Sequence, residues 1–533
     1  MKSKTTVRLQ HCSTAGRTPP FLIVFALGSL ALCQTAQAVN PAPDGAYPGG
    51  NTAEGQAALL SLTTGGFNTA VGFFSLRSDT TGQLNTAIGA GTLLLNTGDE
   101  NTATGAGALL SNITGYQNTA NGAFALFSNT EGLQNTANGA SALFSNADGQ
   151  ADTANGFQAL FSNTAGDSNT ANGTNSVFSN TTGSFNTANG SAALDHNTTG
   201  NLNTAIGEEA LFSNTEGARN TATGSQSLLL NTTGTDNTAD GSYALFGNTT
   251  GNFNTANGDS ALFANTTGSN NAANGYGALL GNTTGDNNTA TGYQALINNN
   301  AGSLNTATGF TALFSNTTGG SNTAVGDLAL YNNTAGTGNV ALGADAGFHA
   351  TTGNGNVYIG AGMEGVADES DHTYIRNINS TSVGGGGSDF VTVDLTTGLL
   401  GHASSSRRYK EDIKSMDNAS EALFALNPVT FRYKKDIDKS QSLQYGLVAE
   451  DVAQVDPDLA IRDAKGQIEN VRYSAVNAML LNEFLKEHRR MQKLEAALDT
   501  VNTRLEKQAA QIQKVTAQVD ATKPLPHLVL NNP

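Results

Sequence analysis

The chain has 533 residues, a formal net charge of -17 at pH 7, 62 glycines, no tryptophan and only 13% charged residues. This composition is unlike that of a globular enzyme. The acidic balance argues against nucleic acid and anionic membrane surfaces as partners, because both are themselves negatively charged.

Residues 1–38 have the pattern of a secretory signal peptide: a basic start, an apolar run over residues 21–32 and an Ala-Gln-Ala cleavage site. The apolar run is too short for a permanent membrane helix, so we expect an exported protein, secreted or at the cell surface, without a transmembrane segment in the mature chain. Both cysteines, Cys12 and Cys33, lie inside the signal, which excludes disulfides and thiolate metal sites after cleavage. Neither a metal nor a cofactor is expected.

After a linker over residues 39–50, the segment 51–365 repeats with a period of 17 residues around the anchor Asn-Thr-Ala-x-Gly. The register holds over nineteen starts, and only the step from Asn85 to Asn101 is one residue short. Such regularity indicates stacked units that contact chiefly their neighbours. Glycine, threonine and asparagine in every unit exclude a helix and favour short strands joined by turns, with glycine at positive-φ corners. The predicted fold is therefore mostly β, a parallel β-solenoid or β-roll.

An Ala-Leu-Phe triplet recurs at a fixed offset, and we expect its leucine and phenylalanine to stack on themselves in the interior. Each unit supplies only two or three large apolar residues, fewer than a single chain would need to fill a solenoid. We therefore expect three chains to share one axis, as a homotrimer. A second recurring position predicts a buried amide ladder, made by Asn129, Asn146, Asn163, Asn180, Asn214 and Asn248.

The Asn-Thr-Ala-x-Gly pattern resembles the head repeats of trimeric autotransporter adhesins, although those repeats are usually shorter and richer in valine and isoleucine. The resemblance implies a trimeric, adhesive shaft with a cell-surface or glycan ligand. No four-strand outer-membrane anchor follows the shaft, so the sequence departs from that family where the family is most specific.

Two other functions are alternatives for the shaft. The threonine rows could form an ice-binding face, but turn chemistry explains them more simply. The segment 51–365 has nineteen acidic residues against Arg77 and Arg219, at scattered offsets and without a calcium-binding pattern, so they serve solubility. No paired carboxylates recur as a glycan-degrading tailspike would need.

Residues 366–404 form a β-rich neck. Segments 371–376 and 390–394 alternate like strands, with a flexible glycine run between them. His372 and His402 are isolated, which indicates solvated or packed histidines rather than ligands.

The composition changes at Ser405-Ser406-Arg407-Arg408-Tyr409-Lys410, where the lysine-poor shaft ends. A serine and a lysine five residues apart can form a dyad in which the neutral amine takes the hydroxyl proton and the oxygen becomes a nucleophile. Three further motifs follow in the order Asn427-Pro428-Val429-Thr430-Phe431-Arg432-Tyr433, Tyr445-Gly446-Leu447-Val448-Ala449-Glu450-Asp451-Val452 and Val471-Arg472-Tyr473-Ser474.

Together these motifs resemble the C-terminal intramolecular chaperone and self-cleaving peptidase domain (Peptidase_S74) of endosialidases and phage tail fibres, here over residues 405–475. The resemblance implies that Ser405 is the nucleophile and Lys410 the base. It departs from the family at Ser406, where aspartate is common, and at Tyr409, where leucine or phenylalanine is. Arg407 and Arg408, with burial in a trimer interface, would favour a neutral lysine.

Residues 476–520 are predicted to form a coiled coil, followed by a tail over residues 521–533. The a positions are Phe484, Met491, Leu498, Leu505, Ile512 and Val519, and the d positions include Leu480, Leu494, Val501 and Val515. The sequence as a whole predicts an exported homotrimeric fibre or adhesin-like protein, whose C-terminal domain drives trimerisation and is released by autoproteolysis. A glycan-degrading tailspike and an ice-binding solenoid are the alternatives.

Overall fold

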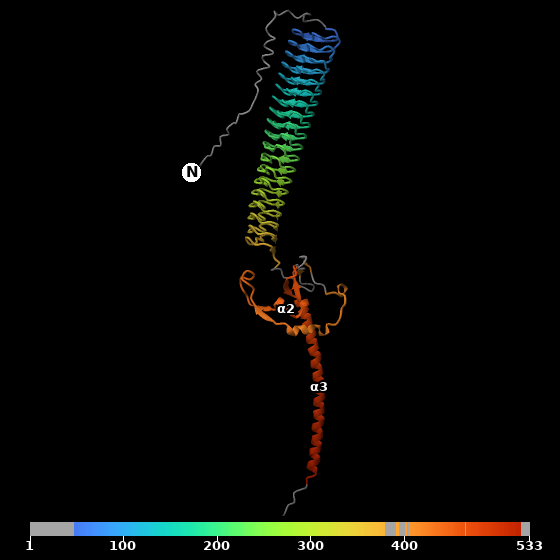
Figure 1. Cartoon of the computed structure of the whole chain (residues 1–533), viewed down its shortest axis with the longest axis vertical. Coiled ribbons are helices and arrows are strands. Elements are labelled where there is room, and N and C mark those ends of the chain that lie inside the picture. Colours follow the sequence, from blue (N-terminus) through green and yellow to red (C-terminus); the bar gives the residue numbers. More distant parts are fainter. Residues whose placement is uncertain (1–46, 379–390, 394–399, 402–404, 464, 524–533) are drawn as a thin grey trace, which may run out of the picture. The chain divides into compact units, whose positions relative to one another are not determined.

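The structure is a computed structural model that describes residues 47–378, 391–393, 400–401, 405–463 and 465–523 (Figure 1). It divides into two compact units, Met1–Thr381 and Ser382–Pro533. The predicted signal peptide with both cysteines, the glycine run of the neck, His402 and the prolines after the last helix lie outside the described residues.

The first unit is a parallel β-solenoid, the stack of turns coloured blue to yellow in Figure 1. Each strand pairs with the next one along the chain, as in Thr119 with Thr136, an offset of 17 residues. The β3–β4 and β19–β20 steps are one residue shorter. The predicted solenoid is thus confirmed, and its sheet continues into the segment expected to be the neck. The strands are β1 (Thr52–Glu54), β2 (Thr69–Val71), β3 (Thr86–Ile88), β4 (Thr102–Thr104), β5 (Thr119–Asn121), β6 (Thr136–Asn138), β7 (Thr153–Asn155), β8 (Thr170–Asn172), β9 (Thr187–Asn189), β10 (Thr204–Ile206), β11 (Thr221–Thr223), β12 (Thr238–Asp240), β13 (Thr255–Asn257), β14 (Ala272–Asn274), β15 (Thr289–Thr291), β16 (Thr306–Thr308), β17 (Thr323–Val325), β18 (Val340–Leu342), β19 (Val357–Ile359) and β20 (Thr373–Ile375).

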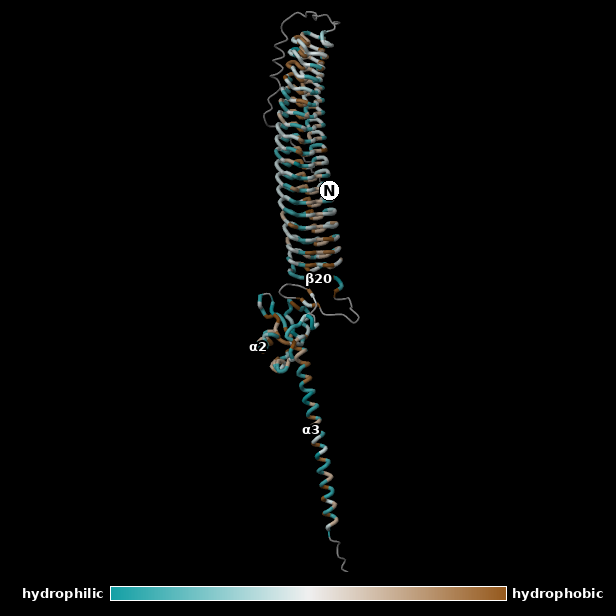
Figure 2. The backbone as a smooth tube through the Cα atoms, turned by 90° about the vertical axis from the view of Figure 1, so that its right-hand side faces the viewer, coloured by the Kyte–Doolittle hydropathy of each residue, from teal (hydrophilic) through white to brown (hydrophobic). Residues whose placement is uncertain are grey.

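Equivalent residues of successive turns form rows along the solenoid, and we name each row after its member in the turn 118–134. The core consists of the Ala120, Ala125 and Leu126 rows, whose members are almost all fully buried. Figure 2 shows hydrophobic residues in brown at the same places in successive turns. Small side chains therefore close the interior within one chain.

This packing corrects two expectations. The phenylalanines do stack on one another, with ring centroids 5.1 Å apart for Phe127 and Phe144, but the Phe127 row is only half-buried and lies outside the core. The premise that one chain cannot fill its own interior is also wrong, because alanine and leucine suffice for so narrow a coil. A shared core of three chains is not required by this geometry.

Two buried amide ladders run through the interior. In the predicted Asn129 row, Asn146 Nδ2 donates to Asn129 Oδ1 at 2.8 Å, and the row is confirmed as a ladder. The anchor asparagines form a second, unpredicted ladder: the backbone N–H of Asn135 donates to Asn118 Oδ1 at 3.0 Å, and Asn135 Nδ2 donates to Gly149 O at 2.8 Å. Buried amides need such partners, and a constant spacing supplies them from one turn to the next. The hydrogen bonds of the two ladders therefore explain why asparagine recurs at the same two positions of the repeat.

The turns need left-handed backbone, but not always glycine. Gly122 has φ 142°, and an added Cβ would lie 2.5 Å from the carbonyl oxygen of Gly139, so glycine is required there. Phe124 and Leu126 have φ 62° and 50° without being glycine. The expectation of glycine at the corners is therefore only partly right. Hydrogen bonds between turns, such as Leu126 N to Ala142 O at 2.9 Å, hold these strained residues in place.

Aromatic rings close the last turns of the solenoid. Tyr358 and Tyr374 replace the alanine of the Ala120 row, and their ring centroids lie 5.7 Å apart. Tyr358 is fully buried, and Glu369 accepts hydrogen bonds from Tyr374 Oη at 2.7 Å and from the Val366 N–H at 3.0 Å. The larger rings and this carboxylate cap the open end of the core.

The second unit contains small antiparallel sheets, short helices and one long helix. Its buried core is formed by Val452, Leu459, Val471 and Met479. The elements are β21 (Thr392–Val393), β22 (Leu400–Gly401), η1 (Arg407–Tyr409), η2 (Asp417–Ala425), β23 (Val429–Phe431), β24 (Gln444–Gly446), α2 (Ala449–Val455), η3 (Pro457–Leu459), β25 (Ala460–Arg462), β26 (Ile468–Val471) and α3 (Tyr473–Ala521).

Candidate functional site

The predicted dyad lies on an exposed segment of the second unit, ahead of the residues that form its core. Ser405 and Lys410 flank the single turn of η1, and both are exposed in the isolated chain. Within the described residues, no hydrogen bond joins the Ser405 hydroxyl to the Lys410 amine. Among the described residues, the dyad is therefore neither joined by a hydrogen bond nor buried.

The motifs downstream of the dyad, by contrast, meet in space. β23 and β24 pair as an antiparallel hairpin, with Thr430 opposite Tyr445. Tyr473, at the start of α3, accepts a hydrogen bond at its Oη from the Leu447 N–H at 3.1 Å. An added Cβ on Gly446 would lie 2.9 Å from that same oxygen, so a larger residue there would displace the Tyr473 hydroxyl. Three segments far apart in the sequence thus build one small scaffold.

A buried polar cluster, which sequence reasoning missed, fixes η2 to α3. Ser420 Oγ donates to Glu483 Oε1 at 2.5 Å, Lys486 Nζ donates to the same oxygen at 2.6 Å, and Asn482 Nδ2 donates to Ser420 Oγ at 2.6 Å. The pKa of Glu483 is lowered, first by Lys486 and then by the serine hydroxyl. Ser420 is fully buried and sits 63 residues from Glu483 in sequence, so only the fold reveals the pair.

The same unit has an apolar groove of about 480 Å³ beside the hairpin. It is lined by Leu423, Leu426, Pro428, Val429, Thr430, Tyr445, Gly446, Leu447 and Val476. Several of these belong to the motifs that were identified in the sequence, which places the motif residues at an exposed apolar surface.

The long helix α3 confirms the predicted helix and carries its heptad residues unburied. Phe484 is 67%, Leu498 61% and Ile512 66% exposed. Along the 49 residues of the helix only Met479 and Glu483 are buried. An apolar stripe of this length on a single helix is the surface that partner helices cover in coiled coils.

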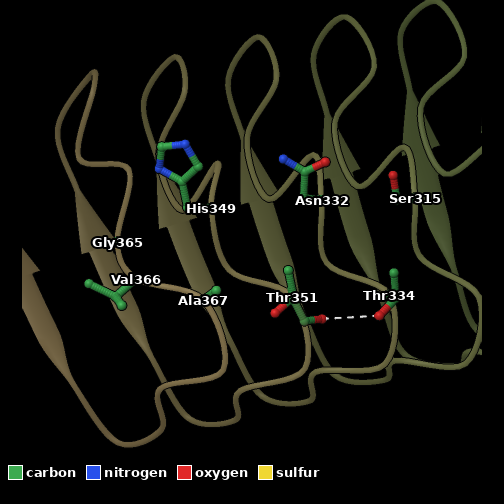
Figure 3. Close-up of a pocket in the computed structure, with 8 residues that line it drawn as sticks. All are labelled: Ser315, Asn332, Thr334, His349, Thr351, Gly365, Val366 and Ala367. Carbon is green, nitrogen blue, oxygen red and sulfur yellow. Dashed lines mark hydrogen bonds between the residues drawn. The ribbon is translucent and has the colours of Figure 1, made fainter.

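A second candidate site is an open groove on the first unit, near its C-terminal end (Figure 3). It has a volume of about 630 Å³ and is lined by Ser315, Asn332, Thr334, His349, Thr351, Gly365, Val366 and Ala367. His349 Nδ1 lies 3.1 Å from Glu364 Oε2, and Thr334 Oγ1 donates to Thr351 O at 3.3 Å. The groove offers hydroxyl, amide and imidazole groups, but no pair of facing carboxylates lines it.

In the part of the chain that the structure describes, no group of three or more His, Cys, Asp or Glu side chains is placed to hold a metal ion. A search of the same residues for helices long and apolar enough to cross a membrane found none.

Comparison with protein families places the C-terminal unit. Residues 405–461 match the family model of the chaperone of endosialidase, Peptidase_S74. The resemblance predicted from the motifs is confirmed over these residues. The match begins at Ser405 and ends before the last of the predicted motifs. Comparisons with curated proteins and with solved structures give no match.

Proposed function

We propose that the chain is an exported homotrimeric fibre, or adhesin-like surface protein, whose C-terminal domain trimerises it and is then released by cleavage next to Ser405. A β-solenoid shaft followed by a chaperone-of-endosialidase domain makes this a tail-fibre-like protein. The family match beginning at Ser405 carries the proposal, because its start coincides with the change of composition where the lysine-poor part of the chain ends.

Trimerisation is supported by the unburied stripe on α3. Residues such as Leu498 and Leu505 are 61% and 55% exposed, and no neighbouring element among the described residues covers them. Burying a leucine side chain stabilises by about 1.5–3 kcal/mol, so a stripe of ten such residues strongly favours association. The parallel helices of three copies would cover one another.

Assembly would also supply what the single chain lacks at the dyad. Once a neighbouring copy buries Ser405 and Lys410, the neutral lysine takes the serine proton, and Oγ attacks the carbonyl carbon of an adjacent peptide bond. The peptide C–N bond breaks, the amine leaves with the proton from lysine, and water then hydrolyses the ester. Cleavage would thus follow trimerisation.

Intact-mass analysis of the secreted protein tests the cleavage. The wild-type chain should appear as two fragments that separate next to Ser405, whereas Ser405→Ala and Lys410→Ala should each give the uncut chain, because the dyad acts as one unit. Lys414→Ala, a nearby exposed lysine, is the matched control and should still cleave. An uncut wild-type trimer would refute the peptidase while leaving the chaperone. In that case Ser406→Asp, which restores the residue common in the family, should recover cleavage.

One alternative gains support from a specific observation. Thr119 and its equivalents lie in strands and point outward on the parallel sheet, so for this row the expectation of turn chemistry is wrong. The Thr130 row does sit in turns, where Thr164 Oγ1 donates to Thr181 O at 2.9 Å. A regular outward row of threonines is what an ice-binding face requires. Thermal hysteresis that Thr136→Tyr abolishes would establish this second function, and no hysteresis would remove it.

A further inference from the structure

One row of the solenoid surface is apolar over almost its whole length. The Phe127 row begins with Leu60 and Arg77, and from Leu94 to Phe348, roughly 70 Å at ~4.8 Å per turn, it is apolar at every position but one. Its members are half-buried, so each exposes part of a large side chain to solvent. The row consists of Leu94, Leu110, Phe127, Phe144, Phe161, Phe178, Asp195, Phe212, Leu229, Phe246, Phe263, Leu280, Ile297, Phe314, Tyr331 and Phe348.

Few charged residues lie in this row, although the shaft as a whole is strongly acidic. Asp195 is its one charged member between Leu94 and Phe348. Other rows also carry large exposed apolar residues, among them three that charged residues interrupt. In the Gln134 row, Glu100, Arg219 and Asp236 separate Phe67, Phe185 and Phe253. In the Ala123 row, Tyr276, Tyr293 and Phe310 lie between Asp259 and Asp327, and the Asn121 row, with Ile88, Ile206 and Val325, includes Glu54 and Asp240.

The neighbouring Ser128 row leaves space beside the rings. Its members are mostly serine, glycine and alanine, as at Ser145, Ser162 and Gly247. A partner can therefore approach the aromatic edges without displacing large side chains. Small residues beside large ones are the arrangement that allows two surfaces to interdigitate.

Ring geometry limits what the partner can be. Phe144 is stacked between Phe127 and Phe161 at 5.1 and 5.0 Å, with interplanar angles of 3° and 7°. Both faces of the middle ring are covered, and its edge is left for a partner. A sugar needs an open ring face, whereas ring edges suit the apolar and aromatic side chains of another protein surface.

We propose that the Phe127 row is the line along which the shafts of three copies of this chain contact one another, parallel and in register. The inference rests on the trimer of the proposed function and adds where its shafts meet. Each shaft has a closed core, so the copies join from outside rather than through a shared interior. Contact along this apolar row keeps most of the acidic residues of the rods away from the interface.

Asp195 and His196 provide the register. His196 Nδ1 lies 3.5 Å from Asp195 Oδ1, so a polar pair of a carboxyl and an imidazole interrupts the apolar surface at one height. In register, the pairs of three copies lie at the same level and can exchange partners. A shift by one to six turns would place Asp195 against an apolar side chain of another shaft, which costs the desolvation of a carboxylate.

Cysteine crosslinking of the full-length protein tests the contact, with Cys12 and Cys33 replaced by serine. Ser145→Cys, beside the row, should form disulfide-linked dimers on mild oxidation, because equivalent residues meet near a threefold axis. Asn138→Cys, on the outward face of β6, is the control in the same turn and should stay uncrosslinked. Both variants keep a small side chain in an exposed or half-buried place, so folding is preserved.

Sedimentation of the same samples separates the two hypotheses. Trimers with a crosslink at Ser145→Cys and none at Asn138→Cys support the inference. Trimers without a crosslink at Ser145→Cys, or with equal crosslinking at both positions, overturn the contact but leave the proposed trimer intact. Monomers overturn the trimer and the contact together.

Discussion

The two units bury their apolar residues in different ways. In the shaft, the leucines and alanines of each turn are covered by the turns on either side, and the amides of both asparagine rows bond to their neighbours. In the second unit, the core is small and the longest helix leaves its leucines and phenylalanine exposed. Repetition makes one copy of the shaft sufficient for its own core, whereas no described element of the second unit covers the apolar stripe of the helix. The proposed trimer would therefore depend most on the part of the chain that does not repeat.

The largest effect is expected when charges are placed in the apolar stripe of α3. Leu498→Asp with Leu505→Asp should abolish trimers in sedimentation, because charges at two buried positions of a coiled coil remain desolvated and unpaired. The core of each shaft should still form, since it closes within one chain. Thr503→Asp, on the opposite side of the predicted coil, is the matched control and should stay trimeric. Trimers in the double variant would show that the helix is not the organiser.

Within the shaft, neighbouring apolar residues should contribute differently to the free energy of unfolding. Leu143→Ala should lower the free energy of unfolding by about 2–5 kcal/mol, because it opens a cavity in a fully buried row. Phe144→Ala should cost clearly less, since this ring is half-buried and stacked at the surface. Chemical denaturation of the two variants measures the difference. A larger loss for Phe144→Ala would place the phenylalanine row inside after all.

Asp152 stands where almost every other turn has the anchor asparagine, and it is fully buried. Burial raises its pKa from 3.8 to about 8, although hydrogen bonds from Asn169 oppose the shift. The unfolded chain loses this proton first as pH rises, so stability should fall between about pH 4 and about pH 8.

Asp152→Asn should remove that slope and raise the stability at pH 8 by more than about 1 kcal/mol, with little effect near pH 4. Thermal melts across this pH range provide the measurement. Asp148→Asn, at an exposed position of the shaft, is the control and should leave the pH dependence of the stability unchanged. A variant with the wild-type slope would mean that the buried carboxyl is not its source.

The smallest effect is expected in the second unit. Ser420→Ala removes the hydroxyl that joins Glu483 to Asn482, and it should destabilise the unit by about 1–2 kcal/mol, since Lys486 still pairs with the carboxylate. Ser415→Ala, whose hydroxyl is exposed, is the comparison. Equal denaturation midpoints for the two variants would assign no structural weight to the cluster.

Much of the shaft could be predicted because, in a strict repeat, equivalent residues of successive units lie next to each other. The 17-residue period therefore implied parallel strands, and the recurring asparagine implied a ladder. The inside and outside of the coil could not be assigned in the same way. Ala125 and Leu126 are adjacent and both point inward, because the left-handed backbone at Leu126 breaks the alternation of a strand. That turn sends Phe127 outward, and hydrophobicity alone does not distinguish these two neighbours.

For the candidate site, the sequence placed Ser405 at the boundary where the family match begins. It did not indicate that both dyad residues would be exposed in one chain, because their predicted surroundings belong to other copies. The Ser420 and Glu483 pair was also invisible, since no local pattern links residues so far apart. Trimerisation, cleavage and export stay predictions for the experiments above.

The constant offset between paired strands has a consequence for how such a chain changes over generations. Because each turn meets only the turn before and the turn after, an in-frame loss or gain of one period returns every row to an equivalent neighbour. Even the turn that is one residue short keeps its anchor bond, from Asn101 N to Asn85 Oδ1 at 2.9 Å. Unequal recombination between repeats can therefore lengthen or shorten the shaft in steps of roughly 5 Å without requiring a new fold.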